Sequence, residues 1–438
     1  MPKPSELLIE PRWLIPVEPH GAVLEGHCVA VSAGKIIDVL PTETARQRYQ
    51  PERHVVLADH VLIPGLVNLH THAAMTLLRG IADDLPLMEW LRSHIWPAEA
   101  KHVSAAFVRD GTLLACAEML RGGITCFNDM YFFPEAAAEA AQSLGMRAVL
   151  GLVIIEFPTT YAADAEDYIV KGLAARDRLR SDSLISFCMA PHAPYTVSDA
   201  SFERIATLAA QLDLPVHVHL HETRGEIEES VRRHGMRPIE RLDRLGLLGP
   251  GLIAVHATHL DAAEIRLLAK YDCSVAHCPT SNMKLASGIA PVAAELDEGI
   301  RIGLGTDGAA SNNRLDLFQE MRHAALLAKA ASGNAAALDA HTVLRMATLN
   351  GATALGLGKR IGSIRPGKAA DLCAVRLDTL QTVPCFNPVS HLVYAAGREH
   401  VSHVWINGIP QVENGELRQC NTSRLLDIAH LWQNKLIA

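Results

Sequence analysis

Two histidines stand one residue apart at the end of an apolar run. The run, Val61 to Leu69, has a proline and a glycine near its start and is typical of a buried strand that ends in His70-Thr71-His72. Because side chains alternate between the two faces of a strand, His70 and His72 point the same way and can reach one ion. Imidazole nitrogen is a donor that zinc and similar metals favour. The pair predicts a metal site, although chance is the alternative in a chain with 22 histidines.

Three later apolar runs also end in residues that bind metals. They end in His217-Val218-His219-Leu220-His221-Glu222, in Val255-His256-Ala257-Thr258-His259 and in Gly305-Thr306-Asp307-Gly308. Histidine in a buried strand is costly unless it is hydrogen-bonded or coordinated. The repetition at strand ends therefore favours a metal site. A structural role in the core remains the alternative for His217, His221 and His259.

The elements that must position these residues alternate between strand and helix. Eight apolar runs are expected to be strands: Val61 to Leu69, Ile124 to Asp129, Ala148 to Ile154, Leu184 to Met189, Val216 to Leu220, Leu252 to His256, Cys273 to Ala276 and Arg301 to Gly305. Helical spacing separates them, for example in Phe107 to Leu120, Pro134 to Leu144, Ser201 to Leu212 and Ala262 to Lys270. This α/β pattern predicts a (β/α)₈ TIM-like barrel, in which chemistry occurs at the carboxyl ends of the strands. An open, doubly wound sheet is the alternative.

Both ends of the chain read instead as short alternating strands. They are Glu6 to Ile9, Ala22 to Val31 and Lys35 to Leu40 at the start, and Ala370 to Val375, His400 to Ile406 and Ile409 to Val412 near the end. Asn407-Gly408 is typical of a hairpin turn. We expect residues 1–58 and 365–438 to form one small β-sandwich, and residues 59–364 to form the catalytic barrel.

Composition limits the possible functions. The chain has 438 residues, of which 49% are hydrophobic and 20% charged, as in globular proteins. A net charge of -8 argues against a nucleic-acid partner. We find neither a secretion signal nor a run that could span a bilayer, and therefore expect a cytoplasmic protein with no membrane partner. The nine cysteines include no Cys-x-x-Cys pair, which predicts reduced thiols without disulfides.

Together these motifs resemble the amidohydrolase superfamily, which joins a metal-bearing (β/α)₈ barrel to a small β-sandwich. Longer runs resemble its 5-methylthioadenosine/S-adenosylhomocysteine deaminases. They are His72-Ala73-Ala74-Met75-Thr76-Leu77-Leu78-Arg79-Gly80, Met88-Glu89-Trp90, Pro191-His192-Ala193-Pro194-Tyr195 and Asp307-Gly308-Ala309-Ala310-Ser311-Asn312-Asn313. The resemblance covers nearly the whole chain and implies hydrolytic deamination of a purine nucleoside.

The resemblance also implies a ligand set. His70, His72, His219 and Asp307 are expected to bind one divalent metal, with zinc the favoured ion. Two-metal members of the superfamily bridge their ions with a modified lysine at the end of strand four. Here that strand reads Ser186-Phe187-Cys188-Met189-Ala190-Pro191-His192 and contains no lysine. A mononuclear site is therefore favoured.

Three residues are expected to do the chemistry. Asp307 takes the proton of the attacking water and later helps to deliver it to ammonia, and His256 orients or polarises that water. Glu222 is the expected acid that protonates the purine ring, as a glutamate that is not a metal ligand does in base deaminases. As the alternative, Glu222 could cap a following helix, Gly225 to Arg233.

Substrate recognition rests on fewer residues. Glu99 is expected to accept hydrogen bonds from the ribose hydroxyls, and Glu89 is the competing candidate. Trp90 is expected to line the purine pocket, and His192 to hydrogen-bond the purine or its sugar. After strand three, the run Leu150-Gly151-Leu152-Val153-Ile154-Ile155-Glu156-Phe157-Pro158 has no arginine to hold an amino-acid carboxylate.

That absence favours 5'-methylthioadenosine as the substrate, with S-adenosylhomocysteine and adenosine as further substrates. The competing functions are a guanine or triazine aminohydrolase of the same superfamily, and a non-catalytic scaffold that keeps the fold. From the resemblance we also expect a homo-oligomer, either a dimer or a tetramer.

Overall fold

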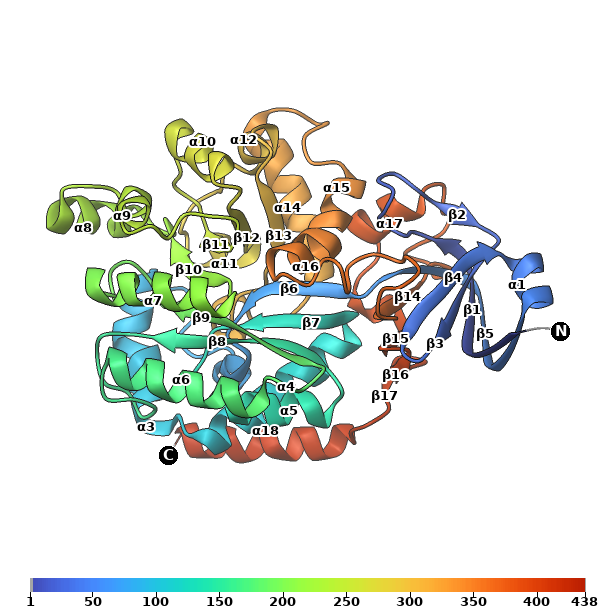
Figure 1. Ribbon diagram of the computed structural model, residues 1–438, viewed down its shortest axis with the longest axis horizontal. Helices are drawn as coiled ribbons and strands as arrows, with labels where there is room; N and C mark the ends of the chain where they lie inside the picture. Colours follow the sequence, from blue (N-terminus) through green and yellow to red (C-terminus); the bar gives the residue numbers. More distant parts are fainter. Residues whose placement is uncertain (1–2, 438) are drawn as a thin grey trace.

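The computed structural model describes residues 3–437 and contains a barrel with a mixed sheet beside it (Figure 1). The barrel has eight parallel strands in chain order. They are β6 (Leu66–Thr71), β7 (Ile124–Asp129), β8 (Arg147–Ile154), β9 (Ile185–Pro191), β10 (Val216–Leu220), β11 (Leu252–His256), β12 (Ser274–His277) and β13 (Arg301–Leu304). The segment after β13 returns to β6, where the Asp307 backbone N–H donates to the His70 carbonyl at 3.0 Å. The predicted (β/α)₈ fold is confirmed.

Helices cover the outside of the barrel. They include α4 (Ala105–Arg121), α5 (Pro134–Ser143), α6 (Ala165–Leu179), α7 (Asp199–Leu212), α8 (Arg224–His234), α9 (Pro238–Arg244), α10 (Ala262–Lys270) and α14 (Leu317–Ser332). Every residue of β7 and β8 is buried, as expected for parallel strands that are covered on both faces. Local sequence fixes where the helices begin: Asp261 and Glu264 form a capping box at the start of α10.

Shorter helices fill the connections. They are α1 (Thr42–Arg48), η1 (Ala73–Leu78), α2 (Leu87–Trp90), η2 (Leu91–Ile95), α3 (Trp96–His102), α11 (Pro279–Lys284), α12 (Val292–Asp297), α13 (Ala309–Asn312), α15 (Ala340–Arg345), η3 (Met346–Asn350), α16 (Gly351–Ala354), α17 (Pro388–Tyr394) and η4 (Arg398–His400). Three of them, α2, η2 and α3, follow one another after β6 and form one wall of the site described below.

The second sheet has nine strands from both chain ends. They are β1 (Lys3–Leu14), β2 (Leu24–Glu25), β3 (His27–Ser32), β4 (Lys35–Pro41), β5 (Tyr49–Pro64), β14 (Leu372–Arg376), β15 (Val401–Ile406), β16 (Ile409–Glu413) and β17 (Glu416–Leu417). Strand β5 joins the two halves because it pairs with β1 on one side and β14 on the other. The turn between β3 and β4 lies against the turn between β15 and β16, because a Cβ on Gly34 would be 3.0 Å from the Asn407 carbonyl oxygen. The predicted small β domain from both ends is therefore confirmed.

The structure divides one predicted strand in two. We expected a single strand over Val61 to Leu69, but residues 61–64 finish β5 and residues 66–71 form β6, so the chain passes from one sheet to the other at Gly65. A Cβ at Gly65 would lie 2.1 Å from the Thr125 hydroxyl oxygen, so only glycine fits there. The apolar run is continuous because both sheets bury it, and periodicity alone therefore does not reveal the crossing.

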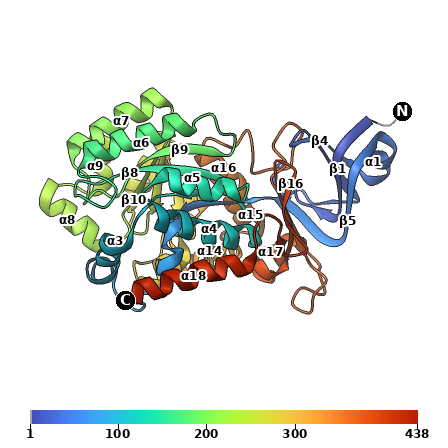
Figure 2. The same cartoon turned by 90° about the horizontal axis from the view of Figure 1, so that it is seen from below.

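The last helix, α18 (Thr422–Ile437), lies along the barrel rather than in the sheet (Figure 2). The Trp432 ring packs on Phe107 of α4 with centroids 5.2 Å apart, and its Nε1 donates to Asp110 at 2.8 Å. The division into 1–58, 59–364 and 365–438 stays a prediction. We propose Gly65 as its first boundary, with α18 assigned to the barrel.

No helix within residues 3–437 has the length and apolar character that crossing a membrane requires. All nine cysteines lie in this range as free thiols, and most of them are buried.

Candidate active site and metal centre

Four strand ends bring imidazoles and one carboxylate to a common point. The ligand atoms of His70, His72 and His219 lie within 4.8 Å of one another, and so do those of His70, His256 and Asp307. Asp307 Oδ1 is 3.3 Å from Nε2 of both His70 and His72. Residues separated by up to 237 positions in the chain thus converge at the carboxyl end of the barrel, as the strand-end argument predicted.

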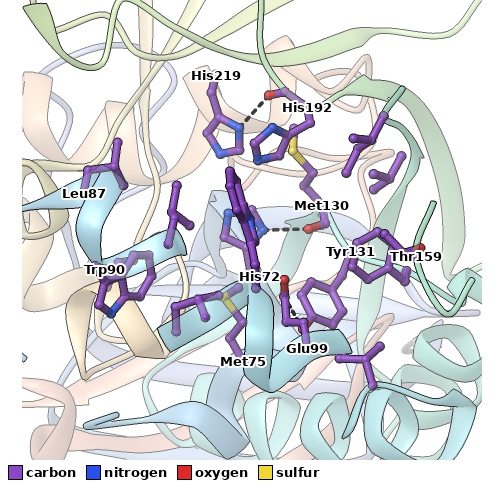
Figure 3. A pocket seen from close by; sticks show the side chains of 18 of the residues that line it. His72, Met75, Leu87, Trp90, Glu99, Met130, Tyr131, Thr159, His192 and His219 are labelled. Atoms are coloured by element: carbon purple, nitrogen blue, oxygen red, sulfur yellow. Dashed lines mark hydrogen bonds between the residues drawn. The ribbon is translucent and has the colours of Figure 1, made fainter. Parts of the chain in front are cut away.

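The opposite ring nitrogens of three histidines in this cluster are each held by another group. Nδ1 of His72 lies 2.6 Å from the Met130 carbonyl oxygen, and Nδ1 of His219 lies 2.6 Å from the His192 carbonyl oxygen (Figure 3). Nδ1 of His70 is 3.0 Å from Nε2 of His217. These contacts fix the rings and aim their Nε2 atoms at the centre, an arrangement typical of metal-binding histidines.

Asp307 is buried yet well supplied with donors. Ser281 and Ser311 donate to its Oδ2 at 2.6 and 2.7 Å, and the Gly308 N–H donates to Oδ1 at 2.7 Å. Burial raises the pKa of Asp307, but the close approach of the His70 ring, together with His72 and His256, brings the pKa well below its usual value. The side chain is therefore an ionised carboxylate. Its φ of 61° is left-handed, and strained backbone of this kind is frequent at functional sites.

Glu222 lies next to this cluster. Its Oε2 is 3.8 Å from His256 Nε2, and its Oε1 accepts from the Ser287 hydroxyl at 3.4 Å. His256 Nδ1 is held 2.8 Å from Asn282 Oδ1, so Nε2 is the nitrogen that faces Glu222 and the pocket. Burial raises the pKa of Glu222, which favours a protonated side chain that can donate a proton.

Glu222 does not cap the helix that follows it. Thr223 is the N-cap of α8 and accepts from the Glu226 N–H. The Glu226 carboxylate accepts from the backbone N–H groups of His221 and Glu222 at 2.9 and 2.8 Å. Because Thr223 is the residue that caps the helix, and Glu222 lines the cavity instead, the capping alternative fails.

A cavity of about 530 Å³ extends from the cluster. His72, His192, His219, Glu222, His256 and Asp307 line its inner end, and Trp90 and Glu99 line the wall formed by α2, η2 and α3. Glu99 accepts from the Tyr131 hydroxyl at 2.7 Å, and burial raises the pKa of Glu99 to about 7. Glu89, the competing candidate, is exposed and lies outside the cavity lining.

His192 directly follows β9, as predicted from the sequence. Its Nδ1 is 3.0 Å from the Thr196 hydroxyl, and burial lowers the pKa of His192 to about 3. The ring is therefore neutral, and it lies beside His219 with centroids 5.0 Å apart. Figure 3 shows both rings on the side of the pocket opposite Glu99 and Tyr131.

Sequence comparison gives the context of this geometry. Residues 61–409 match the amidohydrolase family, which is more than half of the chain. This chain belongs to the amidohydrolase family. A protein of Saccharophagus degradans named 5-methylthioadenosine/S-adenosylhomocysteine deaminase is 48% identical over 435 residues, which cover 99% of this chain and 98% of that protein.

Two further relatives are similar over most of this amidohydrolase. A 5'-deoxyadenosine deaminase of Methanothermobacter thermautotrophicus is 45% identical over 369 residues, covering 84% of this chain and 86% of its own. The crystal structure of an adenosine deaminase from Xanthomonas campestris with bound zinc is 54% identical and superposes with a TM-score of 0.98, covering 100% of this chain and 99% of that one. The enzyme class and the resemblance drawn from the motifs are thereby confirmed.

Together, His70, His72, His219, His256 and Asp307 form a donor cluster, meaning a group of side chains that can donate electron pairs to a metal, and this cluster fits a divalent ion. His70 Nε2 is fully buried and has no hydrogen-bond partner within the described residues, although Asp307 Oδ1 is close by. A buried ring nitrogen without a hydrogen bond costs folding free energy. An ion bound between this nitrogen and the neighbouring ligand atoms would remove that cost. Neutral imidazoles and an ionised carboxylate are the ligands that zinc and similar ions take. The predicted metal dependence is thus confirmed.

The other strand-end histidines have structural partners. His221 accepts from the Ile239 N–H at 3.2 Å, and His259 Nε2 lies 2.6 Å from the Ser287 carbonyl oxygen. His217 contacts His70 behind the donor cluster. The core alternative therefore holds for His221 and His259, whereas His217 supports a ring of the cluster.

Sequence reasoning missed residues at the end of β7. Asp129 accepts from the Ala73 N–H at 2.8 Å and so fixes the backbone directly after His72. Tyr131 holds Glu99. The signal was present, since Asn128-Asp129-Met130-Tyr131 is a polar strand end in a predicted barrel, but it matched no metal-ligand pattern.

Proposed function

We propose that this amidohydrolase deaminates adenosine-type nucleosides hydrolytically, and that 5'-methylthioadenosine is its preferred substrate. The products would be the corresponding inosine nucleoside and ammonia. One observation carries the proposal: a buried carboxyl group, Glu222, stands beside an imidazole and carboxylate donor cluster at the inner end of a single cavity. The names of the relatives at 45–54% identity support the same substrate class.

We assign the metal ligands as His70, His72, His219 and Asp307. These residues would hold a divalent metal, with zinc favoured, and the ion would lower the pKa of a bound water to about 7. The ionised Asp307 carboxylate accepts a proton from the attacking water. His256, whose ring is fixed by Asn282, hydrogen-bonds that water and orients it towards the purine.

Glu222 supplies the second proton transfer. As the water oxygen bonds to the amine-bearing carbon of the purine, electrons move into the ring, and Glu222 protonates the ring nitrogen. The carbon–nitrogen bond then breaks, and ammonia leaves with the proton that Asp307 had accepted. The proton that remains on the added oxygen passes to Glu222, which regains its protonated form, so a ring carbonyl is left and one water has been consumed.

Three residues are proposed to hold the nucleoside. Glu99 accepts hydrogen bonds from the ribose hydroxyls, and the neutral His192 ring hydrogen-bonds the purine or its sugar. Trp90 is 5% exposed and forms part of the cavity wall against which the purine packs.

The part of the cavity after β8 favours a short apolar 5' substituent. Ile155, Phe157 and Trp96 line it, and the Phe157 and Trp96 rings are 5.9 Å apart. The Glu156 carboxylate accepts from the Ser198 N–H at 2.9 Å. Apolar walls suit a methylthio group, whereas an amino-acid carboxylate would lose its hydration there without an ionic partner. S-adenosylhomocysteine and adenosine are therefore proposed as secondary substrates.

A substrate screen tests the proposal. Purified enzyme of known metal content is assayed for ammonia release from 5'-methylthioadenosine, adenosine, S-adenosylhomocysteine, adenine and guanine. We expect the highest kcat/KM with 5'-methylthioadenosine. Faster turnover of guanine or free adenine would favour the competing aminohydrolase of free bases, and no turnover by metal-loaded enzyme would favour the scaffold. A cytoplasmic location, a homo-oligomer and the absence of a nucleic-acid partner stay predictions.

A further inference from the structure

One wall of the cavity is a separate segment between barrel elements. Residues 87–102, which comprise α2, η2 and α3, carry Trp90, Trp96 and Glu99 into the cavity lining. The middle of the segment is a π-helix, Leu91–Ile95. Short π-helical turns within α-helices are frequent at functional sites. Glu99 lies in the first turn after the π-helix.

This wall has few polar attachments to the barrel. Packing of apolar side chains holds most of it. Within the described residues, one hydrogen bond joins a side chain of residues 87–102 to the rest of the chain, and it is the bond from the Tyr131 hydroxyl to Glu99 Oε1 at 2.7 Å. Tyr131 lies two residues after the end of β7, is 5% exposed, and its ring centroid is 5.2 Å from that of Phe132. The donor therefore lies two residues after a barrel strand, and the acceptor lies on the wall.

We propose that Tyr131 is a positioning residue that makes the enzyme specific for a ribose diol. By donating to Oε1 it fixes the Glu99 carboxylate, whose Oε2 has no hydrogen bond within the described residues and remains available to the ribose hydroxyls. The proposal rests on the proposed function, in which Glu99 binds the ribose. A carboxylate that is already oriented loses less conformational freedom when the diol binds.

Tyr131→Phe tests this, with Tyr161→Phe as the matched control. Tyr161 belongs to the same aromatic cluster, 6.4 Å from Phe132, but its buried hydroxyl has no hydrogen-bond partner within the described residues. We measure kcat/KM for adenosine and for 2',3'-dideoxyadenosine. Tyr131→Phe should lower kcat/KM for adenosine by about tenfold, the usual effect of one hydrogen bond to a charged group, and should change that for the dideoxynucleoside by less than about threefold. Tyr161→Phe should leave the ratio of the two values unchanged.

A double-mutant cycle shows whether Tyr131 acts through Glu99. If it does, adding Tyr131→Phe to Glu99→Gln should produce little further loss, because the carboxylate that Tyr131 positions is already gone. Additive losses, or equal losses for both nucleosides in Tyr131→Phe, would overturn the proposal, because they indicate a merely structural role. Thermal melting and metal analysis of each variant verify that it is folded. Failure of the proposed function would look different, since the wild-type enzyme would then release no ammonia from adenosine.

Discussion

Asn68 and Thr306 hydrogen-bond to each other twice. Asn68 Nδ2 donates to the Thr306 hydroxyl at 2.8 Å, and the Thr306 N–H donates to Asn68 Oδ1 at 2.9 Å. Both residues are fully buried. Asn68 precedes His70 by two residues and Thr306 directly precedes Asp307, so this pair joins the first and last barrel strands where the donor cluster forms. The geometry of the metal site thus depends on how the barrel closes.

Asn68→Ala should weaken metal binding as well as stability. The change leaves the Thr306 N–H without its partner, at a cost of about 1–3 kcal/mol, and lets Asp307 move relative to His70. Metal retained after dialysis and the melting temperature should both fall. Asn350→Ala is the control, because Asn350 donates to the Ile302 carbonyl on the same β13, away from the cluster, at 3.0 Å. Equal metal loss in the two variants would contradict the argument.

Glu222→Gln should separate catalysis from metal binding. The amide cannot protonate the purine ring, so kcat should fall by about 10²–10⁴-fold. Metal content should be unchanged, because Glu222 is not among the donors proposed to hold the ion. Glu228→Gln, on the exposed face of α8, should have wild-type activity. The acid role would be wrong if kcat fell less than tenfold, or if the loss of activity only followed a loss of metal.

His219→Ala and His221→Ala should differ in metal content. Both rings belong to the same strand end, but His219 contributes a donor atom to the cluster and His221 accepts from the Ile239 N–H. His219→Ala should lose the metal and the activity, whereas His221→Ala should keep the metal at lower stability. Elemental analysis after dialysis measures this. Chelator treatment of the wild type should reproduce the first result, and added zinc should reverse it.

The sequence predicted the barrel, the donor cluster and Glu222 because each depends on a local rule. Parallel strands end at one edge of a barrel, so ligands such as His70, His219 and Asp307 could be expected to meet although the chain separates them widely. Glu222 was recognised from its position just after a ligand strand.

Contacts between distant segments could not be predicted. The hydrogen bond from Tyr131 to Glu99 and the pairing of Asn68 with Thr306 depend on side-chain directions that periodicity does not encode. The crossing at Gly65 was missed for a similar reason, because two sheets share one apolar run.

Glu99 should give ribose recognition a dependence on pH. Burial raises the pKa of Glu99 to about 7 from its usual 4.5, and the Tyr131 hydrogen bond opposes that rise. The ionised form is the better acceptor for two hydroxyls, so recognition should weaken as the pH falls below about 7. The ratio of kcat/KM for adenosine to that for 2',3'-dideoxyadenosine should therefore decrease as the pH falls. The ratio isolates ribose recognition, because the ionisation of groups that act on both substrates cancels in it. A ratio that keeps the same inflection in Glu99→Gln would exclude Glu99 as its source.

Glu295 should destabilise the protein at alkaline pH. Its carboxyl group is fully buried in α12, has no hydrogen-bond partner within the described residues, and burial raises its pKa from 4.5 to about 8. Between these two values the unfolded chain releases the proton while the folded chain keeps it, so the contribution of Glu295 to stability is most favourable below pH 4.5 and is lost as the pH rises to about 8.

Glu295→Gln removes this ionisation while keeping the shape and a polar group. Its melting temperature should be close to that of the wild type at about pH 5 and higher by about 2–4 °C at about pH 9, where the wild type must ionise or expose the carboxyl group. Glu298→Gln is the control, because Glu298 is exposed just after the same helix and should behave like the wild type at both pH values. A difference between Glu295→Gln and the wild type that does not change with pH would show that packing, rather than ionisation, sets the cost of this buried carboxyl group.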